Sequence, residues 1–91
     1  MTQPAITLYL TGWCPFCQRA KALLTSKSLV FKEIDVDDDA KLREEMVARS
    51  GRRTVPQIFI GDTHVGGCDD LFALEDSGGL DRLIRGIDER G

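Results

Sequence analysis

Two cysteines three positions apart constrain this chain more than any other feature of its sequence. Cys14 and Cys17 enclose Pro15 and Phe16, and apolar stretches of different periodicity flank the pair. The stretch 5–10 before them is uncharged and rich in β-forming residues, as in a strand that is buried on both faces. After Pro15 the apolar residues recur with helical spacing. The pair is therefore predicted to lie where a buried strand passes into a helix.

The predicted start of this helix favours a thiolate at Cys14. Pro15 fits the first helical position, because the missing N–H of a proline costs nothing there. Cys14 then lies at the mouth of the helix, where unpaired N–H groups and the positive end of the dipole favour an anion. Cys17 follows one turn later on the same face, within reach of Cys14. It can therefore attack a mixed disulfide that forms on Cys14.

Zinc binding is the main alternative for this cysteine pair. Together with Cys68 and His64, the pair could form a Cys₃His zinc site. Context favours redox chemistry, because zinc knuckles usually have glycines beside the cysteines and serve chains with a poor core. A structural disulfide is also disfavoured, since a bridge that closes so short a loop constrains the unfolded chain little. His64 is expected in a hairpin, without a catalytic role.

Length and composition predict one domain, 1–91, in a reducing compartment. The 91 residues suffice for one core, and neither a signal peptide nor an apolar run of about 20 residues is evident. Three cysteines, an odd number, agree with the cytoplasm. With 15 acidic residues and no basic cluster among aromatics, neither nucleic acid nor membrane is an expected partner. The first acidic residue is Glu33, so the cysteine region is locally cationic and attracts anions.

The remaining periodicity and turn residues predict the element order β-α-β-α-β-β-α-α. Strands are expected at 5–10, 29–36, 56–60 and 63–65, with Pro56 as the first residue of the third. Helices are expected at 15–27, between Asp39 and Gly51, from Cys68 to the glycine pair 78–79, and over 80–87. The first crossover should make its two strands parallel, whereas the last two strands should form a hairpin. We therefore expect an α/β fold with a four-stranded mixed sheet and helices on both faces.

Three motifs in this order resemble those of dithiol glutaredoxins. They are Cys14-Pro15-Phe16-Cys17, Thr54-Val55-Pro56-Gln57 and Gly66-Gly67-Cys68-Asp69-Asp70, and the stretch 49–60 is similar to that of the small bacterial members. The resemblance, which covers about Ile6 to Ile84, implies a thioredoxin fold and the reduction of protein–glutathione mixed disulfides and protein disulfides. It also implies glutathione as co-substrate, no permanently bound cofactor or metal, and a monomer. Disulfide-containing proteins are the implied partners, with ribonucleotide reductase as one candidate.

The resemblance also implies roles for individual residues. Cys14 matches the nucleophile, Cys17 the resolving cysteine, and Pro56 a cis-proline that faces them. Glutathione would be bound by Arg52, Thr54, Val55, Pro56, Gly67, Cys68 and Asp69, with Trp13, Pro15 and Phe16 supporting the active site. Val55 would pair its backbone with the cysteine of glutathione, as an added strand does. The start of the helix at Cys68 suits a carboxylate, and Asp69 suits an ammonium group.

Three residues depart from the common glutaredoxin pattern. Thr11 stands where many members have a lysine, and we expect it at the solvent-facing edge of the pocket. Trp13 precedes Cys14 as a tryptophan does in thioredoxins, and Phe16 replaces a common tyrosine. Two alternatives therefore stay open: a redoxin that thioredoxin reductase reduces, and an iron–sulfur cluster carrier. Pro15 disfavours the carrier, because cluster-binding members usually have a smaller or more flexible residue there.

Overall fold

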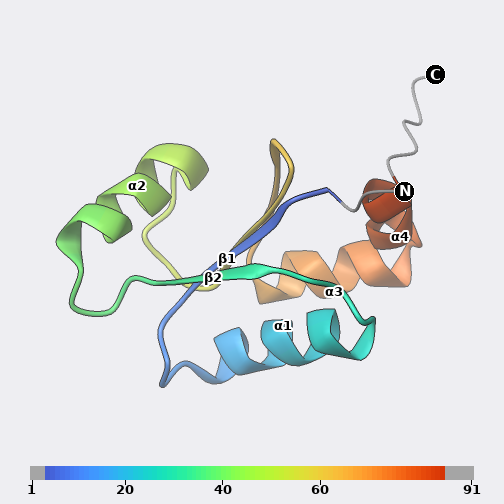
Figure 1. The fold of residues 1–91 in the computed structure, drawn as a ribbon, viewed down its shortest axis with the longest axis horizontal. Helices are drawn as coiled ribbons and strands as arrows, with labels where there is room; N and C mark the ends of the chain where they lie inside the picture. The colour runs from blue at the N-terminus through green and yellow to red at the C-terminus, as the bar shows by residue number, and fades with distance from the viewer. Residues whose placement is uncertain (1–3, 86–91) are drawn as a thin grey trace.

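A mixed sheet with helices on both faces forms the centre of the molecule (Figure 1). The computed structural model describes residues 4–85, and the predicted element order is confirmed. The strands are β1 (Ile6–Leu10), β2 (Lys32–Asp35), β3 (Gln57–Ile60) and β4 (Thr63–Gly66), and the helices are α1 (Pro15–Ser26), α2 (Ala40–Ser50), α3 (Cys68–Asp76) and α4 (Gly79–Arg85). The sheet order is β2-β1-β3-β4, parallel between β1 and β2 and antiparallel elsewhere.

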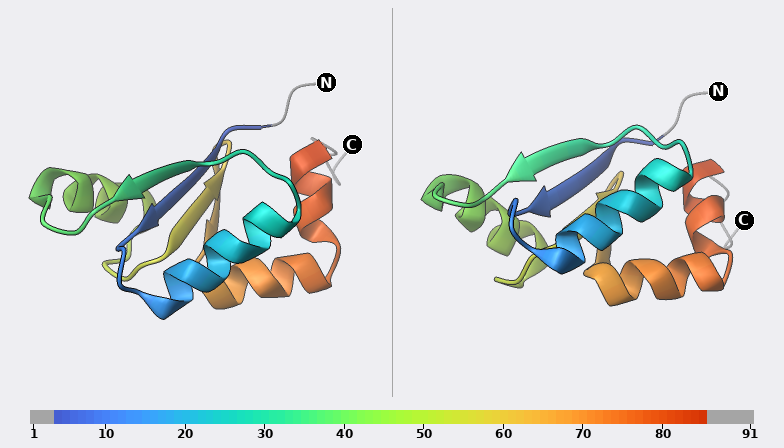
Figure 2. Two further views of the ribbon diagram at one scale, coloured as in Figure 1. Left: turned by 60° about the horizontal axis from the view of Figure 1, so that its bottom comes forward. Right: turned by 90° about the horizontal axis from the view of Figure 1, so that it is seen from below.

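Strand β1 divides the core into two parts, because its side chains alternate between the faces of the sheet. Ile6, Leu8 and Leu10 belong to the larger cluster, which α1, α3 and α4 cover. Tyr9 belongs to the smaller cluster, which it shares with Met46 of α2. Figure 2 shows α1 and α3 side by side on one face, with α2 on the other. The predicted burial of this strand on both faces is therefore confirmed.

Local capping residues define the ends of the first two helices. Cys14 caps α1, and Pro15 is its first residue, as predicted. Asp39 caps α2 by accepting a hydrogen bond from the backbone N–H of Leu42 at 3.0 Å. Gly51 ends α2 in a left-handed conformation, with a φ of 73° that glycine adopts without steric cost. Caps of this kind were readable from the sequence because they depend on neighbouring residues only.

Strands β2 and β3 are shorter than the periodicity predicts. The pairing of β1 with β2 begins at Thr7 and Lys32. The apolar Val30 therefore lies outside β2, and it is 78% exposed. Strand β3 begins at Gln57, one residue later than the predicted start at Pro56, because residues 54–56 belong to the preceding loop. The predicted closing helix is confirmed up to Arg85, and Ile87 lies outside the described residues.

No helix within residues 4–85 has the length and apolar character that crossing a bilayer requires.

We predict that Asp39→Ala lowers the free energy of unfolding by about 0.5–2 kcal/mol, because the Leu42 N–H then loses its capping acceptor. Urea denaturation should show a lower midpoint with an unchanged slope. Asp37→Ala removes a nearby carboxylate of the same charge outside the cap, and it should leave the midpoint nearly unchanged. Equal losses in both variants would mean that charge, rather than the cap, is responsible.

Candidate active site

Three segments distant in sequence converge at one end of the sheet. They are the turn after β1 with the start of α1, the loop before β3 and the start of α3. A cavity of about 210 Å³ lies among them, lined by Phe16, Arg52, Thr54, Val55, Pro56, Gly67, Cys68, Asp69 and Asp70. All the residues that the family resemblance implied for glutathione binding line this cavity. Trp13 and Phe16 have side chains that are 72% and 53% exposed, close to Cys14 in the chain.

The Cys14 sulfur lies between a donor and an acceptor of the backbone. It accepts a hydrogen bond from the backbone N–H of Cys17 at 3.4 Å, which makes it the side-chain cap of α1. Its thiol in turn donates to the Val55 carbonyl at 3.9 Å. The Val55–Pro56 bond is cis, as the resemblance implied. An N–H donor at a helix start stabilises a thiolate, so this geometry suits a nucleophilic sulfur.

Cys17 has a different environment from Cys14, although both are free thiols. Its side chain is fully buried, and burial is the largest of the effects that raise its pKa to about 12. The neighbouring Cys14 sulfur adds to this increase, whereas a backbone hydrogen bond of Thr11 opposes it. Burial also raises the pKa of the Cys68 thiol. Cys17 therefore stays protonated at neutral pH.

The expectation that Thr11 lies at the solvent-facing edge of the pocket is wrong. Its side chain is fully buried, and its hydroxyl has no hydrogen-bond partner within the described part of the chain. Its carbonyl accepts a hydrogen bond from the Cys14 N–H at 3.3 Å. Thr11 directly follows the buried end of β1, and the neighbouring Leu10 and Cys14 are buried as well, so this part of the turn belongs to the interior. Thr11 therefore contacts Cys14 through its backbone and is not among the residues that line the cavity.

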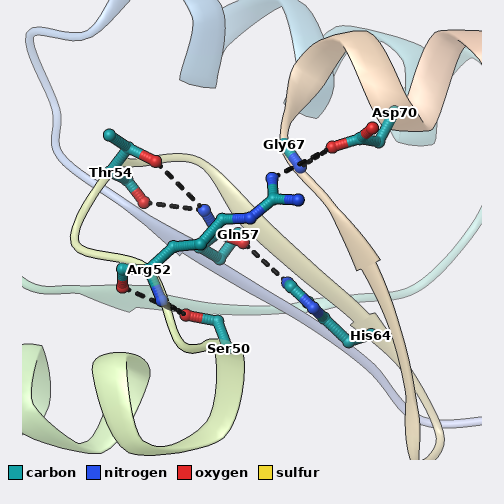
Figure 3. A network of polar contacts seen from close by, with 7 residues as sticks. All are labelled: Ser50, Arg52, Thr54, Gln57, His64, Gly67 and Asp70. Carbon is teal, nitrogen blue, oxygen red and sulfur yellow. Dashed lines mark hydrogen bonds and ion pairs between the residues drawn. The ribbon is translucent and has the colours of Figure 1, made fainter.

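Asp70 holds the start of α3 and was not predicted as a site residue. Its carboxylate accepts from the Gly67 N–H at 2.9 Å and pairs with Arg52 at 3.2 Å (Figure 3). Both contacts lower the pKa of the Asp70 carboxyl, and the hydrogen bond from Gly67 has the larger effect. The carboxylate also lies where a Cβ at residue 66 would be, so a side chain there would collide with it. The position of Asp70 three residues after the helix cap was the available signal.

A zinc site on the cysteine pair finds no support in the geometry. Within residues 4–85, no three histidine, cysteine or acidic side chains are arranged to hold a metal ion. His64 instead points its Nε2 at the Gln57 side-chain oxygen, 2.7 Å away. The fourth ligand that the alternative required is thus engaged elsewhere.

Comparison with known proteins gives consistent matches. The Glutaredoxin family profile matches residues 6–65. Glutaredoxin 3 of Escherichia coli is 56% identical over 80 residues, which cover 88% of this chain and 96% of the relative. A solution structure of glutaredoxin from Brucella melitensis is 55% identical with a TM-score of 0.81, covering 92% of this chain and 91% of that chain. A crystal structure of a buckwheat glutaredoxin–glutathione complex is 26% identical with a TM-score of 0.82, covering 93% and 79%.

We predict that iodoacetamide modifies Cys14 first when the reduced protein is labelled at neutral pH. Cys17 should remain unmodified well into the alkaline range, because burial raises its pKa to about 12. Peptide mass spectrometry against time and pH measures both rates. In Cys14→Ser, Cys17 should still react slowly, because burial persists when the neighbouring sulfur is removed. Labelling of Cys17 as fast as that of Cys14 would contradict this asymmetry.

Proposed function

Because this chain belongs to the glutaredoxin family, we propose that it reduces protein–glutathione mixed disulfides and protein disulfides with glutathione as electron donor. Family membership makes it a thiol–disulfide oxidoreductase with a thioredoxin fold. The observation that carries the glutathione assignment is the Cys14 sulfur, which faces the Val55 backbone beside the cavity. The similar buckwheat glutaredoxin, whose structure is a complex with glutathione, supports the same co-substrate.

In the proposed first step, the Cys14 thiolate attacks the glutathione sulfur of a mixed disulfide. The old disulfide bond breaks, the substrate thiolate leaves and takes up a proton, and Cys14 becomes glutathionylated. A second glutathione thiolate then attacks the bound glutathione sulfur, which releases glutathione disulfide and regenerates the Cys14 thiolate. Each step is an exchange at one sulfur, so the second glutathione thiol supplies the reducing electrons, and the glutathione that arrived in the mixed disulfide leaves as half of glutathione disulfide.

Cys17 provides a second way to resolve the intermediate. Its thiolate attacks the Cys14 sulfur, glutathione leaves, and the internal disulfide is later reopened by glutathione. The hydrogen bond and the charge of Cys14 both raise the pKa of Cys17 in the reduced protein. A mixed disulfide on Cys14 carries no thiolate charge, so Cys17 becomes easier to ionise at the stage that requires it. Protein disulfides follow this route, with Cys17 resolving the bond between Cys14 and the substrate.

The lining of the cavity supports a binding mode for glutathione. The Val55 backbone pairs with the central cysteine residue, as in strand addition, with Thr54 and Pro56 beside it. Gly67 and Cys68, at the start of α3, hold the γ-glutamyl carboxylate, while Asp69 holds its ammonium group. Arg52, which lines the same cavity, contacts the glycine carboxylate. It reaches the ligand from its ion pair with Asp70, which holds the guanidinium beside the cavity.

We place this reaction in the cytoplasm and in a single monomeric domain, 1–91. The three free cysteines fit a reducing compartment. The potential of glutaredoxins, roughly −200 to −230 mV, lies near the cytosolic glutathione poise, so the pair can run in either direction.

The two cysteines should behave unequally in the glutathione-dependent assay coupled to glutathione reductase. We expect Cys14→Ser to abolish turnover, because the nucleophile is lost. Cys17→Ser should still reduce a small glutathione mixed disulfide but should lose the reduction of protein disulfides. Equal loss of both variants on the small substrate would refute the assigned roles.

Two further measurements separate the proposed function from its alternatives. Turnover with thioredoxin reductase that exceeds turnover with glutathione would identify a thioredoxin-type donor. Visible absorbance of the anaerobically purified protein would identify a cluster carrier. The proposal requires faster turnover with glutathione and a colourless protein.

Arg52→Ala should raise the Michaelis constant for glutathione up to about fivefold, the range of a solvent-exposed ion pair. The effect should fade as the salt concentration rises, because both charges are exposed to screening ions. Arg53→Ala removes the same charge one residue away and serves as the matched control. An equal response of the two variants at every salt concentration would mean that only net charge matters.

A further inference from the structure

A buried amide connects the loop of the candidate active site to the edge strand β4 (Figure 3). Gln57, the first residue of β3, is fully buried. Its side-chain nitrogen donates to the Thr54 carbonyl at 3.0 Å and to the Thr54 hydroxyl at 3.3 Å. Both contacts fix the residue that directly precedes Val55. The amide therefore holds the backbone at the point where the loop turns toward Cys14.

The hydrogen-bond partners determine the orientation of this amide and the tautomer of His64. A backbone carbonyl only accepts, so the Gln57 nitrogen must face Thr54 and its oxygen must face His64. The Nε2 of His64 lies 2.7 Å from that oxygen, and it must therefore carry the proton. Burial and the nearby Arg52 lower the pKa of His64 against the opposing effect of Asp70. The neutral ring with a protonated Nε2 is thus the form that matches the network at neutral pH.

The imidazole is held by stacking as well as by its hydrogen bond. It stacks on the Phe59 ring, with centroids 4.8 Å apart and an interplanar angle of 27°. The guanidinium of Arg49, from α2, lies 4.1 Å from the centroid of the same phenyl ring. Phe59 also meets the buried Tyr9 ring edge-on at 5.9 Å. His64 therefore rests on a support built from the sheet and α2, and its Nε2–H has a fixed direction.

We propose that His64 is a positioning residue for the active-site loop. Its Nε2–H orients the Gln57 amide, the amide fixes the carbonyl and hydroxyl of Thr54, and Thr54 sets the placement of the Val55 backbone. The Val55 carbonyl lies 3.9 Å from the Cys14 sulfur, so the effect reaches the candidate ligand site without contact between His64 and the ligand. The inference rests on the proposed function in that Val55 is the backbone partner of glutathione.

Other hydrogen bonds of the loop do not replace the contact between Gln57 and Thr54. Ser50 bonds the backbone of Arg52 through its hydroxyl, and Arg43 donates to the Arg53 carbonyl at 3.4 Å. These bonds anchor the first half of the loop and are exposed to solvent. Gln57 anchors the second half from the interior. Without a donor at position 64, the amide can rotate, and Thr54 then loses both of its contacts.

The test compares His64→Phe, which keeps a stacking ring without a donor, with His64→Gln, which restores an N–H near the Nε2 position. We expect His64→Phe to raise the Michaelis constant for a glutathione mixed disulfide by about 2- to 12-fold, the equivalent of one hydrogen bond. The kcat should stay nearly the same, because Cys14 is unchanged. His64→Gln should return the Michaelis constant to the value of the unaltered protein. Thr63→Ala, on the same strand, is the control. An unchanged constant in His64→Phe, or no restoration in His64→Gln, would overturn the proposal.

Nuclear magnetic resonance provides a second test that does not depend on enzyme activity. In the unaltered protein, ¹⁵N shifts at neutral pH should show a protonated Nε2 and an unprotonated Nδ1, and the reverse would overturn the proposal. The amide signals of Thr54 and Val55 should move in His64→Phe and return in His64→Gln. If the unaltered protein fails to turn over with glutathione, the proposed function fails. The amide signals then decide the positioning role alone, and signals that do not move in His64→Phe would refute it.

Discussion

The hydrogen bond from the Cys17 N–H to the Cys14 sulfur is the interaction on which the site depends. It serves at once as the cap of α1 and as a donor to the sulfur that we propose as the nucleophile. The same turn buries Cys17 completely and keeps it protonated, so one local geometry gives two cysteines opposite properties. Pro15 is compatible with this arrangement because the first helical residue requires no N–H donor. The same hydrogen bond therefore caps the first turn of α1 and positions the Cys14 sulfur.

The pairing of β1 with β3 brings the second half of the site to these cysteines. The two strands are antiparallel, with Tyr9 opposite Gln57, so the end of β1 lies beside the beginning of β3. The chain that leaves β1 must then meet the chain that enters β3 at the same end of the sheet. This is why Val55, distant in sequence, reaches the Cys14 sulfur. Two edge strands complete the sheet, and β4 leads directly into α3, which supplies the third wall of the cavity.

Polar side chains connect the loop before β3 to the start of α3 and to β4. Asp70 joins Arg52 to the start of α3, while Gln57 joins Thr54 to His64 of β4 (Figure 3). The Arg52 pair is exposed, with about half of each side chain accessible, and solvent weakens it. The Gln57 contacts are buried, where an unsatisfied amide is costly. The interior network is therefore the firmer constraint on the shape of the loop.

The sequence by itself determined what depends on neighbours along the chain: the cysteine pair at a helix start, the caps at Asp39 and Gly51, and the order of the elements. The family motifs also identified the residues that line the cavity. Only the tertiary structure decided the burial of Thr11, the exposure of Val30 and the pairing of Gln57 with His64. Periodicity reports which face a residue occupies but not where a strand stops or which distant partner a polar group meets. Those outcomes depend on strand register and on contacts between elements that are distant in the sequence, which long-range packing sets.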